Sequence, residues 1–271
     1  MTKQLTIGER EFSVYDEGSG PTILFVHGFP LSHAMWRGQL ETLKTRFRVV
    51  APDLRGFGGS PLPTDSDSAA KSTMRQFADD CAVLLEALRI SEPVVLCGLS
   101  MGGYVAWQFA KHYPGKLRGL VLCDTKAASD TPEAAETRRK MAEHVLKHGT
   151  SAVAEAMPAK LFAKVTHKEK PEIVAEIRKT IEATQPQGLA ASQRGMAERE
   201  DVRTWLPQIA VPTLVIVGRE DAISPVDEMR AIADAIPGAK FHVVEQAGHM
   251  APLEQPGEVN SLIADFVDSL A

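Results

Sequence analysis

One serine of this chain stands in a sequence that is typical of a nucleophile. Gly98, Ser100 and Gly102 form a G-x-S-x-G pattern, which follows an apolar run and precedes a helical pattern. A sharp turn between a strand and a helix strains its central residue and requires small neighbours. The turn also places the serine at a helix N-terminus, whose free N–H groups favour negative charge. We therefore expect Ser100 to be a nucleophile, with a simple helix cap as the alternative.

A serine hydroxyl needs a base within hydrogen-bond reach to react at neutral pH. Of the eight histidines, His249 is favoured because it follows the last predicted strand on a loop of small residues. Most of the others fall on predicted helices or inside a strand, where packing or solvent exposure explains them. His33 stays a possible site-lining residue, and His27 is expected to support its own loop.

The third member of such a site is an acid that holds the histidine in the correct tautomer and stabilises its charged form. Asp221 follows the penultimate predicted strand and precedes a helix, so it is the preferred residue. Its neighbour Glu220 is expected to point elsewhere. Asp124 ends the strand after that of the nucleophile and stays open as the second choice. The order nucleophile, acid, base along the chain (Ser100, Asp221, His249) is typical of sites whose serine stands on a turn between a strand and a helix.

Acyl transfer also needs two N–H donors aimed at the oxygen that gains charge. The backbone N–H of Met101, directly after the nucleophile, is one expected donor. The other is the backbone N–H of Phe29, in the loop that follows an apolar strand, where Gly28 permits a tight turn. Together these residues predict an oxyanion hole, and neither a metal nor a cofactor is expected.

The elements that position these residues alternate along the chain. Apolar runs rich in Val, Ile and Leu predict strands buried on both faces of a parallel sheet, at 12–15, 22–26, 48–51, 93–97, 117–123, 212–217 and 240–244. Helical patterns lie between them, at 33–43, 73–89, 101–112, 226–236 and 256–270. Ser72 or Thr73 is expected to cap the second, and Pro256 to begin the last. This succession predicts an α/β fold.

The alternation is interrupted once, over residues 129–203. This stretch contains no convincing strand, and its helical patterns are broken near Gly149, Pro158, Pro171, Pro186 and Gly188. We interpret it as a helical insertion that returns the chain to the same sheet, with a separate helical domain as the alternative. A further stretch, 60–72, is predicted to be a surface loop.

Five segments, in this order and spacing, make the chain similar to the α/β-hydrolase superfamily over nearly its whole length. They are HGFP (27–30), DLRGFGGS (53–60), GLSMGG (98–103), VGREDAISP (217–225) and GHMAPLEQP (248–256). The resemblance implies an eight-stranded, mostly parallel sheet flanked by helices, with a helical cap inserted after the sixth strand. Residues 1–128 and 204–271 would then form the core domain and 129–203 the cap.

The resemblance also implies a reaction. Dehalogenases and epoxide hydrolases of this fold carry Asp where this chain has Ser100, so acyl transfer is favoured over alkyl transfer. The chain resembles small-molecule carboxylesterases and enol-lactonases, which implies hydrolysis of an ester or lactone through a seryl-acyl intermediate. Carbon–carbon bond hydrolysis, cofactor-free perhydrolase or haloperoxidase activity and a receptor without turnover stay open. Leu99, Met157 and Phe162 are expected to line the substrate pocket.

Composition narrows the expected partners to a small-molecule substrate. The 30 basic and 35 acidic residues give a formal charge of -5 without a basic stripe, which argues against nucleic acid. No apolar stretch has the length of a membrane span. Three cysteines fit no metal spacing and argue against a disulfide framework, so a reduced, cytoplasmic setting is expected. The oligomeric state stays open.

Overall fold

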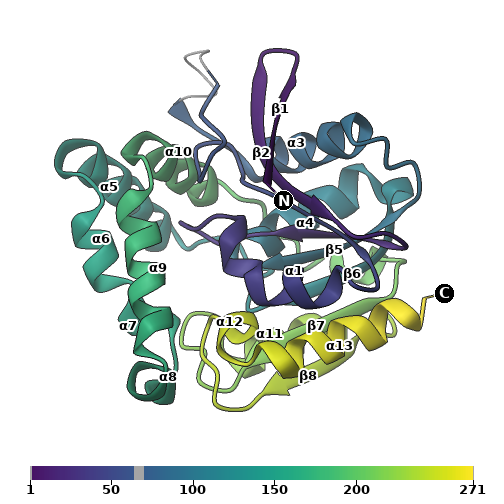
Figure 1. Cartoon of the computed structure of the whole chain (residues 1–271). Coiled ribbons are helices and arrows are strands. Elements are labelled where there is room, and N and C mark those ends of the chain that lie inside the picture. Colours follow the sequence, from purple (N-terminus) through teal and green to yellow (C-terminus); the bar gives the residue numbers. More distant parts are fainter. Residues whose placement is uncertain (1, 64–69, 271) are drawn as a thin grey trace.

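A twisted sheet of eight strands runs through the part of the chain that the computed structural model describes, residues 2–63 and 70–270 (Figure 1). The spatial order is β1-β2-β4-β3-β5-β6-β7-β8. β1 and β2 pair antiparallel, as do β2 and β4, and the other neighbours are parallel. The strands are β1 (Thr2–Ile7), β2 (Arg10–Glu17), β3 (Thr22–Val26), β4 (Arg48–Pro52), β5 (Val94–Leu99), β6 (Leu117–Cys123), β7 (Thr213–Gly218) and β8 (Lys240–Val244). The predicted α/β fold with an eight-stranded, mostly parallel sheet is confirmed.

Helices cover both faces of this sheet, which is why its central strands are apolar without alternation. Every residue of β5 is buried; Val94 and Leu96 join the core on one face, and Val95 and Cys97 the core on the other. The first face packs against α3 (Met74–Ala87), α4 (Met101–His112) and α11 (Val226–Ala235). The second packs against α1 (Arg37–Leu43) and α13 (Pro256–Asp268), both in front in Figure 1.

Local signals in the sequence predicted several element ends. Thr73 caps α3 in a capping box with Gln76, and Pro256 stands in the first turn of α13. The helix expected at 33–43 is instead a 3₁₀ turn, η1 (His33–Trp36), followed by α1. Among the described residues, the core also contains two further short 3₁₀ turns, η2 (Pro114–Lys116) and η3 (Leu206–Gln208), and the short helix α12 (Ala251–Glu254).

The edge strand β1 and part of its neighbour β2 were not predicted from the sequence. β1 is mostly exposed and carries no apolar run, because it lies at the outer edge and packs few side chains. β2 extends beyond the apolar run at 12–15 to the bounds given above because it pairs with β1 on one side and β4 on the other. Part of the loop predicted at 60–72, residues 64–69, lies outside the described residues.

Six helices follow β6 and precede β7, and Figure 1 shows them stacked to one side of the sheet. Within 129–203 the structure forms no strand, as expected. The breaks predicted at Gly149, Pro158, Pro171 and Pro186 are confirmed. The helices are α5 (Pro132–His148), α6 (Ser151–Ala156), α7 (Pro158–Leu161), α8 (Lys164–Glu169), α9 (Pro171–Ala183) and α10 (Pro186–Ala197).

The break predicted near Gly188 is wrong, because Gly188 lies inside α10. A Cβ at this position would stand 1.9 Å from the backbone oxygen of Gly56, so the glycine serves a close backbone contact rather than a helix end. The division of the chain into a core of 1–128 and 204–271 and a cap of 129–203 stays a prediction. No helix of the described residues is long and apolar enough to cross a membrane.

Candidate active site

Ser100 stands in the strained turn that the sequence predicts. It lies between β5 and α4 with φ 53 and ψ -111, a left-handed backbone conformation that is costly for a side chain with a Cβ. The flanking glycines make the turn possible: a Cβ at Gly98 would stand 2.4 Å from the oxygen of Gly102. Within the described residues, the Ser100 hydroxyl forms no hydrogen bond, so it is available to a base or a substrate.

Gly102 holds α4 against β3, and its replacement is expected to disrupt the turn. A Cβ on Gly102 would lie 2.2 Å from the carbonyl oxygen of Val26, which is backbone and cannot rotate away. Gly102→Ala should therefore destabilise the protein by about 1–3 kcal/mol and lower its activity through displacement of Ser100. Thermal unfolding and assays of the expected ester hydrolysis measure both effects. The matched control is Gly257→Ala, where a Cβ meets nothing within 4 Å; equal melting temperatures for the two variants would contradict this account.

The loop after β3 lies directly against the turn that carries Ser100. A Cβ on Gly28 would stand 2.7 Å from Leu99 Cδ2 and 3.5 Å from Ser100 Cβ. In the described part of the chain, the backbone N–H groups of Phe29 and Met101 donate no hydrogen bond. Phe29 precedes a cis peptide bond to Pro30. Two unpaired N–H groups beside a candidate nucleophile are the donors that an oxyanion hole requires, and their catalytic role stays a prediction.

His27 supports this loop from within the core, as the sequence analysis expected. Its side chain is fully buried, Nδ1 hydrogen-bonds the Gly28 carbonyl oxygen at 2.9 Å, and Nε2 accepts from the Leu54 N–H at 3.0 Å. These two bonds require a neutral ring with its proton on Nδ1. Burial lowers the pKa of His27 from its ordinary value of 6.5 to about 4. His27 is therefore a structural histidine and not a second base.

This shift predicts a pH dependence of stability. Because the pKa of His27 is lower in the folded state, its contribution is present above pH 6.5 and is lost as the pH falls toward 4. Between pH 7 and 5 the loss should be about 2 kcal/mol. Chemical unfolding of wild type and of His27→Gln at both pH values measures it as the difference between the two pH dependences. Identical pH dependences would show that His27 does not titrate as its burial demands.

Asp221 and His249 are brought together at the carboxyl ends of the parallel strands. Asp221 follows β7 and His249 follows β8, and the carboxyl ends of β5 to β8 lie in register: Leu99 pairs with Cys123, Cys123 with Ile216, and Gly218 with Val244. His249 Nδ1 and Asp221 Oδ2 are 2.8 Å apart, and both residues are buried.

Two backbone donors fix the carboxylate of Asp221. Its Oδ1 accepts from the N–H groups of Ile223, at 2.7 Å, and Ser224, at 3.0 Å. The remaining oxygen is thereby directed to His249, whose Nδ1 carries the proton of this hydrogen bond. His249 Nε2 is then left unprotonated and can act as a base.

The two rival acids lie elsewhere. Glu220 is exposed, and its Oε2 accepts weakly from the Lys164 N–H at 3.4 Å. Asp124 is completely buried at the end of β6, with φ 48, and its Oδ1 accepts from the Gly218 N–H at 2.8 Å. Its Oδ2 has no hydrogen-bond partner in the described part of the chain. Burial, together with the negative charge of Asp221, raises the pKa of Asp124 well above its usual range.

Glu254 supports the histidine loop, a role that the sequence analysis did not assign. It is completely buried; Oε1 accepts from the N–H groups of Gly248 and Met250, and Oε2 from Ala163 N–H and Thr166 Oγ1. It thus joins the loop of His249 to the inserted helices. A glutamate that directly follows the apolar run 250–253, five positions after the candidate base, is the sequence signal that could have identified it.

The residues predicted to line a substrate pocket take different positions. Leu99 is buried at the end of β5, next to Gly28. Phe162 is buried, and its backbone abuts the histidine loop, since a Cβ on Gly248 would stand 2.9 Å from the Phe162 carbonyl carbon. Met157 is half-buried and lines a cleft between inserted helices. Contact of these three side chains with substrate stays a prediction.

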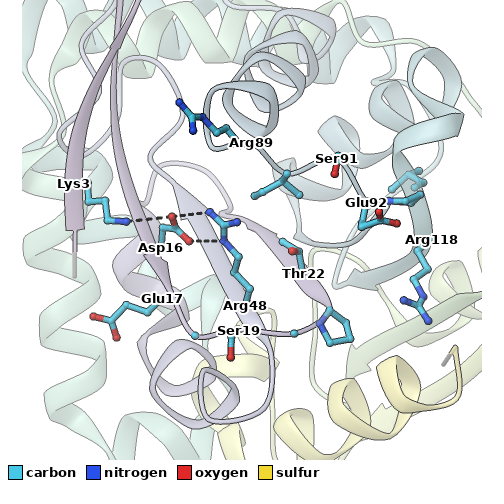
Figure 2. Close-up of a pocket in the computed structure, with 16 residues that line it drawn as sticks. Lys3, Asp16, Glu17, Ser19, Thr22, Arg48, Arg89, Ser91, Glu92 and Arg118 are labelled. Carbon is cyan, nitrogen blue, oxygen red and sulfur yellow. Dashed lines mark hydrogen bonds and ion pairs between the residues drawn. The ribbon is translucent and has the colours of Figure 1, made fainter.

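An open cavity of about 1040 Å³ lies at the other end of the parallel strands, where they begin (Figure 2). Thr22 and Leu117, the first residues of β3 and β6, belong to its lining, whereas the candidate catalytic residues follow the other ends of the strands. Its charged groups include Asp16, which binds Lys3 and Arg48. This cavity is separate from the candidate active site. No cluster of three or more metal-ligating side chains occurs among residues 2–63 and 70–270.

Comparisons with known proteins agree with this fold. The family model described as "alpha/beta hydrolase fold" matches residues 21–256. A thermophilic esterase from Thermogutta terrifontis is 44% identical in sequence, with a TM-score of 0.94 over 100% of this chain and 99% of that one. 3-Oxoadipate enol-lactonase 2 of Acinetobacter baylyi is 26% identical over 93% of this chain and 90% of its own length. 2-Hydroxymuconate semialdehyde hydrolase of a Pseudomonas species is 30% identical, over 94% and 89% respectively.

Proposed function

Because the chain belongs to the α/β-hydrolase fold family, we propose that it hydrolyses a small-molecule carboxylic ester or lactone through a seryl-acyl intermediate. The observation that carries the proposal is the hydrogen bond of 2.8 Å between His249 Nδ1 and Asp221 Oδ2, at the sheet edge where Ser100 stands in its strained turn. Similarity to an esterase and to an enol-lactonase supports the choice of ester or lactone bonds.

In the acylation step, Ser100 Oγ attacks the carbonyl carbon while His249 Nε2 takes the hydroxyl proton. Asp221 stabilises the imidazolium that forms. The carbonyl oxygen becomes an oxyanion, which the Phe29 and Met101 N–H groups bind. When the tetrahedral intermediate collapses, the alcohol leaves with the proton from His249, and the acyl group stays on Ser100.

Deacylation repeats these steps with water as the nucleophile. His249 takes a proton from water, the hydroxide attacks the acyl carbon, and Ser100 Oγ leaves with the proton that His249 returns. The products are a carboxylic acid and the free enzyme. For a lactone both products stay in one molecule. None of these steps requires a metal or an organic cofactor.

Carbon–carbon bond hydrolysis is the second candidate, favoured by the similarity to 2-hydroxymuconate semialdehyde hydrolase. The two candidates differ in the leaving group, which is an alkoxide for an ester and a carbanion for a diketone. An ester is the simpler substrate, because Ser100 and His249 suffice to activate it. Perhydrolase activity would use the same acyl-enzyme with hydrogen peroxide in place of water.

A substrate panel tests the proposal. The purified full chain is assayed on p-nitrophenyl esters of two to eight acyl carbons, on an enol-lactone and on a vinylogous diketone. We expect turnover of an ester or the lactone, with little on the diketone. Turnover of the diketone alone would support the second candidate. If no substrate reacts and a fluorophosphonate fails to label the folded protein, the chain is a ligand receptor without turnover. From the composition of the sequence we also propose that the partner is a small-molecule substrate and that the setting is cytoplasmic.

A further inference from the structure

The inserted helices carry an apolar cleft that lies apart from the candidate nucleophile and base. It has a volume of about 460 Å³ and lies between α5 and the segment α6–α7. Neither Ser100 nor His249 belongs to its lining. A volume of this size lies within the range of small-molecule sites in proteins.

The floor of the cleft is made of aliphatic and thioether side chains. Val153 is buried there, Met141 and Met157 are half-buried, and Ala156 is exposed beside them. Unbranched methionine side chains adapt their shape to an apolar guest. An apolar surface open to solvent costs free energy that a bound hydrocarbon chain recovers. The floor therefore suits an aliphatic chain rather than a polar ligand.

The rim of the cleft is positively charged. Lys140 and Lys160 line it, and no acidic residue of the described chain does so. The side chain of Lys160 forms no hydrogen bond or ion pair within residues 2–63 and 70–270. Lys140 reaches Glu136 of the same helix at 4.0 Å, and both side chains are largely exposed, so this pair is weak. Both ammonium groups are thus available to an anionic group placed at the rim.

We propose that this cleft, between α5 and α6–α7, binds a free aliphatic carboxylate. Its hydrocarbon chain lies on Met141, Val153 and Met157, and its carboxylate pairs with Lys140 or Lys160. The apolar floor alone would accept any hydrocarbon, and the two lysines select the negative end. Binding at this site requires no turnover at Ser100, so it can be tested independently of the proposed function.

Calorimetric titration of the full chain with sodium decanoate, kept below its micelle concentration, tests the proposal. Saturable binding of one decanoate per chain is expected, and decyltrimethylammonium, with the same chain length and opposite charge, should not bind. Ala156→Trp fills the cleft and should weaken binding at least about tenfold. Its control, Ala159→Trp, changes an exposed alanine of α7 outside the lining and should bind as wild type does.

The lysines are tested by charge removal. Lys140→Gln with Lys160→Gln should weaken decanoate binding by about tenfold, whereas Lys147→Gln with Lys168→Gln, exposed lysines outside the lining, should not. Because these lysines are on the surface, their replacement should not affect folding, and the proposal remains testable even if Ala156→Trp fails to fold. Decanoate binding that is unaffected by both changes, or no saturable heat, would overturn the proposal. So would binding of phosphatidylglycerol vesicles without binding of decanoate, or a dimer that Ala156→Trp dissociates.

Discussion

Ser100→Ala should lose about 10⁴-fold or more of kcat/KM for a short-chain p-nitrophenyl ester, because no other group in the proposed mechanism can accept the acyl group. The substitution removes one oxygen atom from a turn whose backbone is held by Gly98 and Gly102, so the fold should persist. Initial rates across substrate concentrations give kcat and KM separately. The loss should fall on kcat, since the hydroxyl acts in the chemical step.

A matched control separates chemistry from folding in that experiment. Ser91→Ala changes an exposed serine at the opposite edge of the sheet, on the rim of the cavity in Figure 2, and should leave kcat/KM unchanged. Circular dichroism and melting temperature should be similar for both variants and wild type. Substantial hydrolysis by a folded Ser100→Ala variant would contradict the assignment of Ser100 as nucleophile.

Asp221→Asn should lower kcat by about 10⁴-fold. The asparagine amide would present an N–H group to His249 Nδ1, which forces the ring proton onto Nε2 and removes the base. The backbone N–H groups of Ile223 and Ser224 could still bind the amide oxygen, so the loop should keep its shape. The variant should therefore show a large fall in kcat relative to wild type and only a small change in melting temperature.

Asp124→Asn is the control that this site supplies, with an opposite expected result. Asparagine has the same shape as aspartate, and its amide oxygen can accept from the Gly218 N–H in place of Asp124 Oδ1. Its kcat should stay within about fivefold of wild type. If Asp124→Asn lost as much activity as Asp221→Asn, the charge that serves His249 would be shared between the two acids.

The sequence predicted the residues that local patterns define. Ser100 was identifiable as a candidate nucleophile because a strand, a glycine-flanked turn and a helix leave their own signals around it. His249 and Asp221 were identifiable because each follows a strand on a short loop, and parallel strands bring such loops to one edge. The choice between Asp221 and Asp124 needed the structure, because both follow strands and only geometry shows which one meets His249.

Features that depend on contacts between distant segments could not be predicted. Glu254 accepts from the N–H of Ala163, 91 positions away in the sequence, and from that of Gly248, and a single glutamate after a short apolar run does not reveal such partners. Gly188 was interpreted as a helix break because glycine has that local preference, whereas its contact with Gly56 decides its role. The exposed strand β1 lacks an apolar pattern because its pairing with β2, rather than burial, holds it in the sheet.

The most direct test of the account is the covalent adduct itself. The folded protein is treated with a fluorophosphonate, digested, and mapped by mass spectrometry. We predict one adduct, on Ser100, that His249→Ala prevents or slows strongly because the hydroxyl then lacks its base. An unlabelled Ser100 in protein that still hydrolyses esters, or an adduct on another residue, would contradict the central claim that Ser100 is the nucleophile.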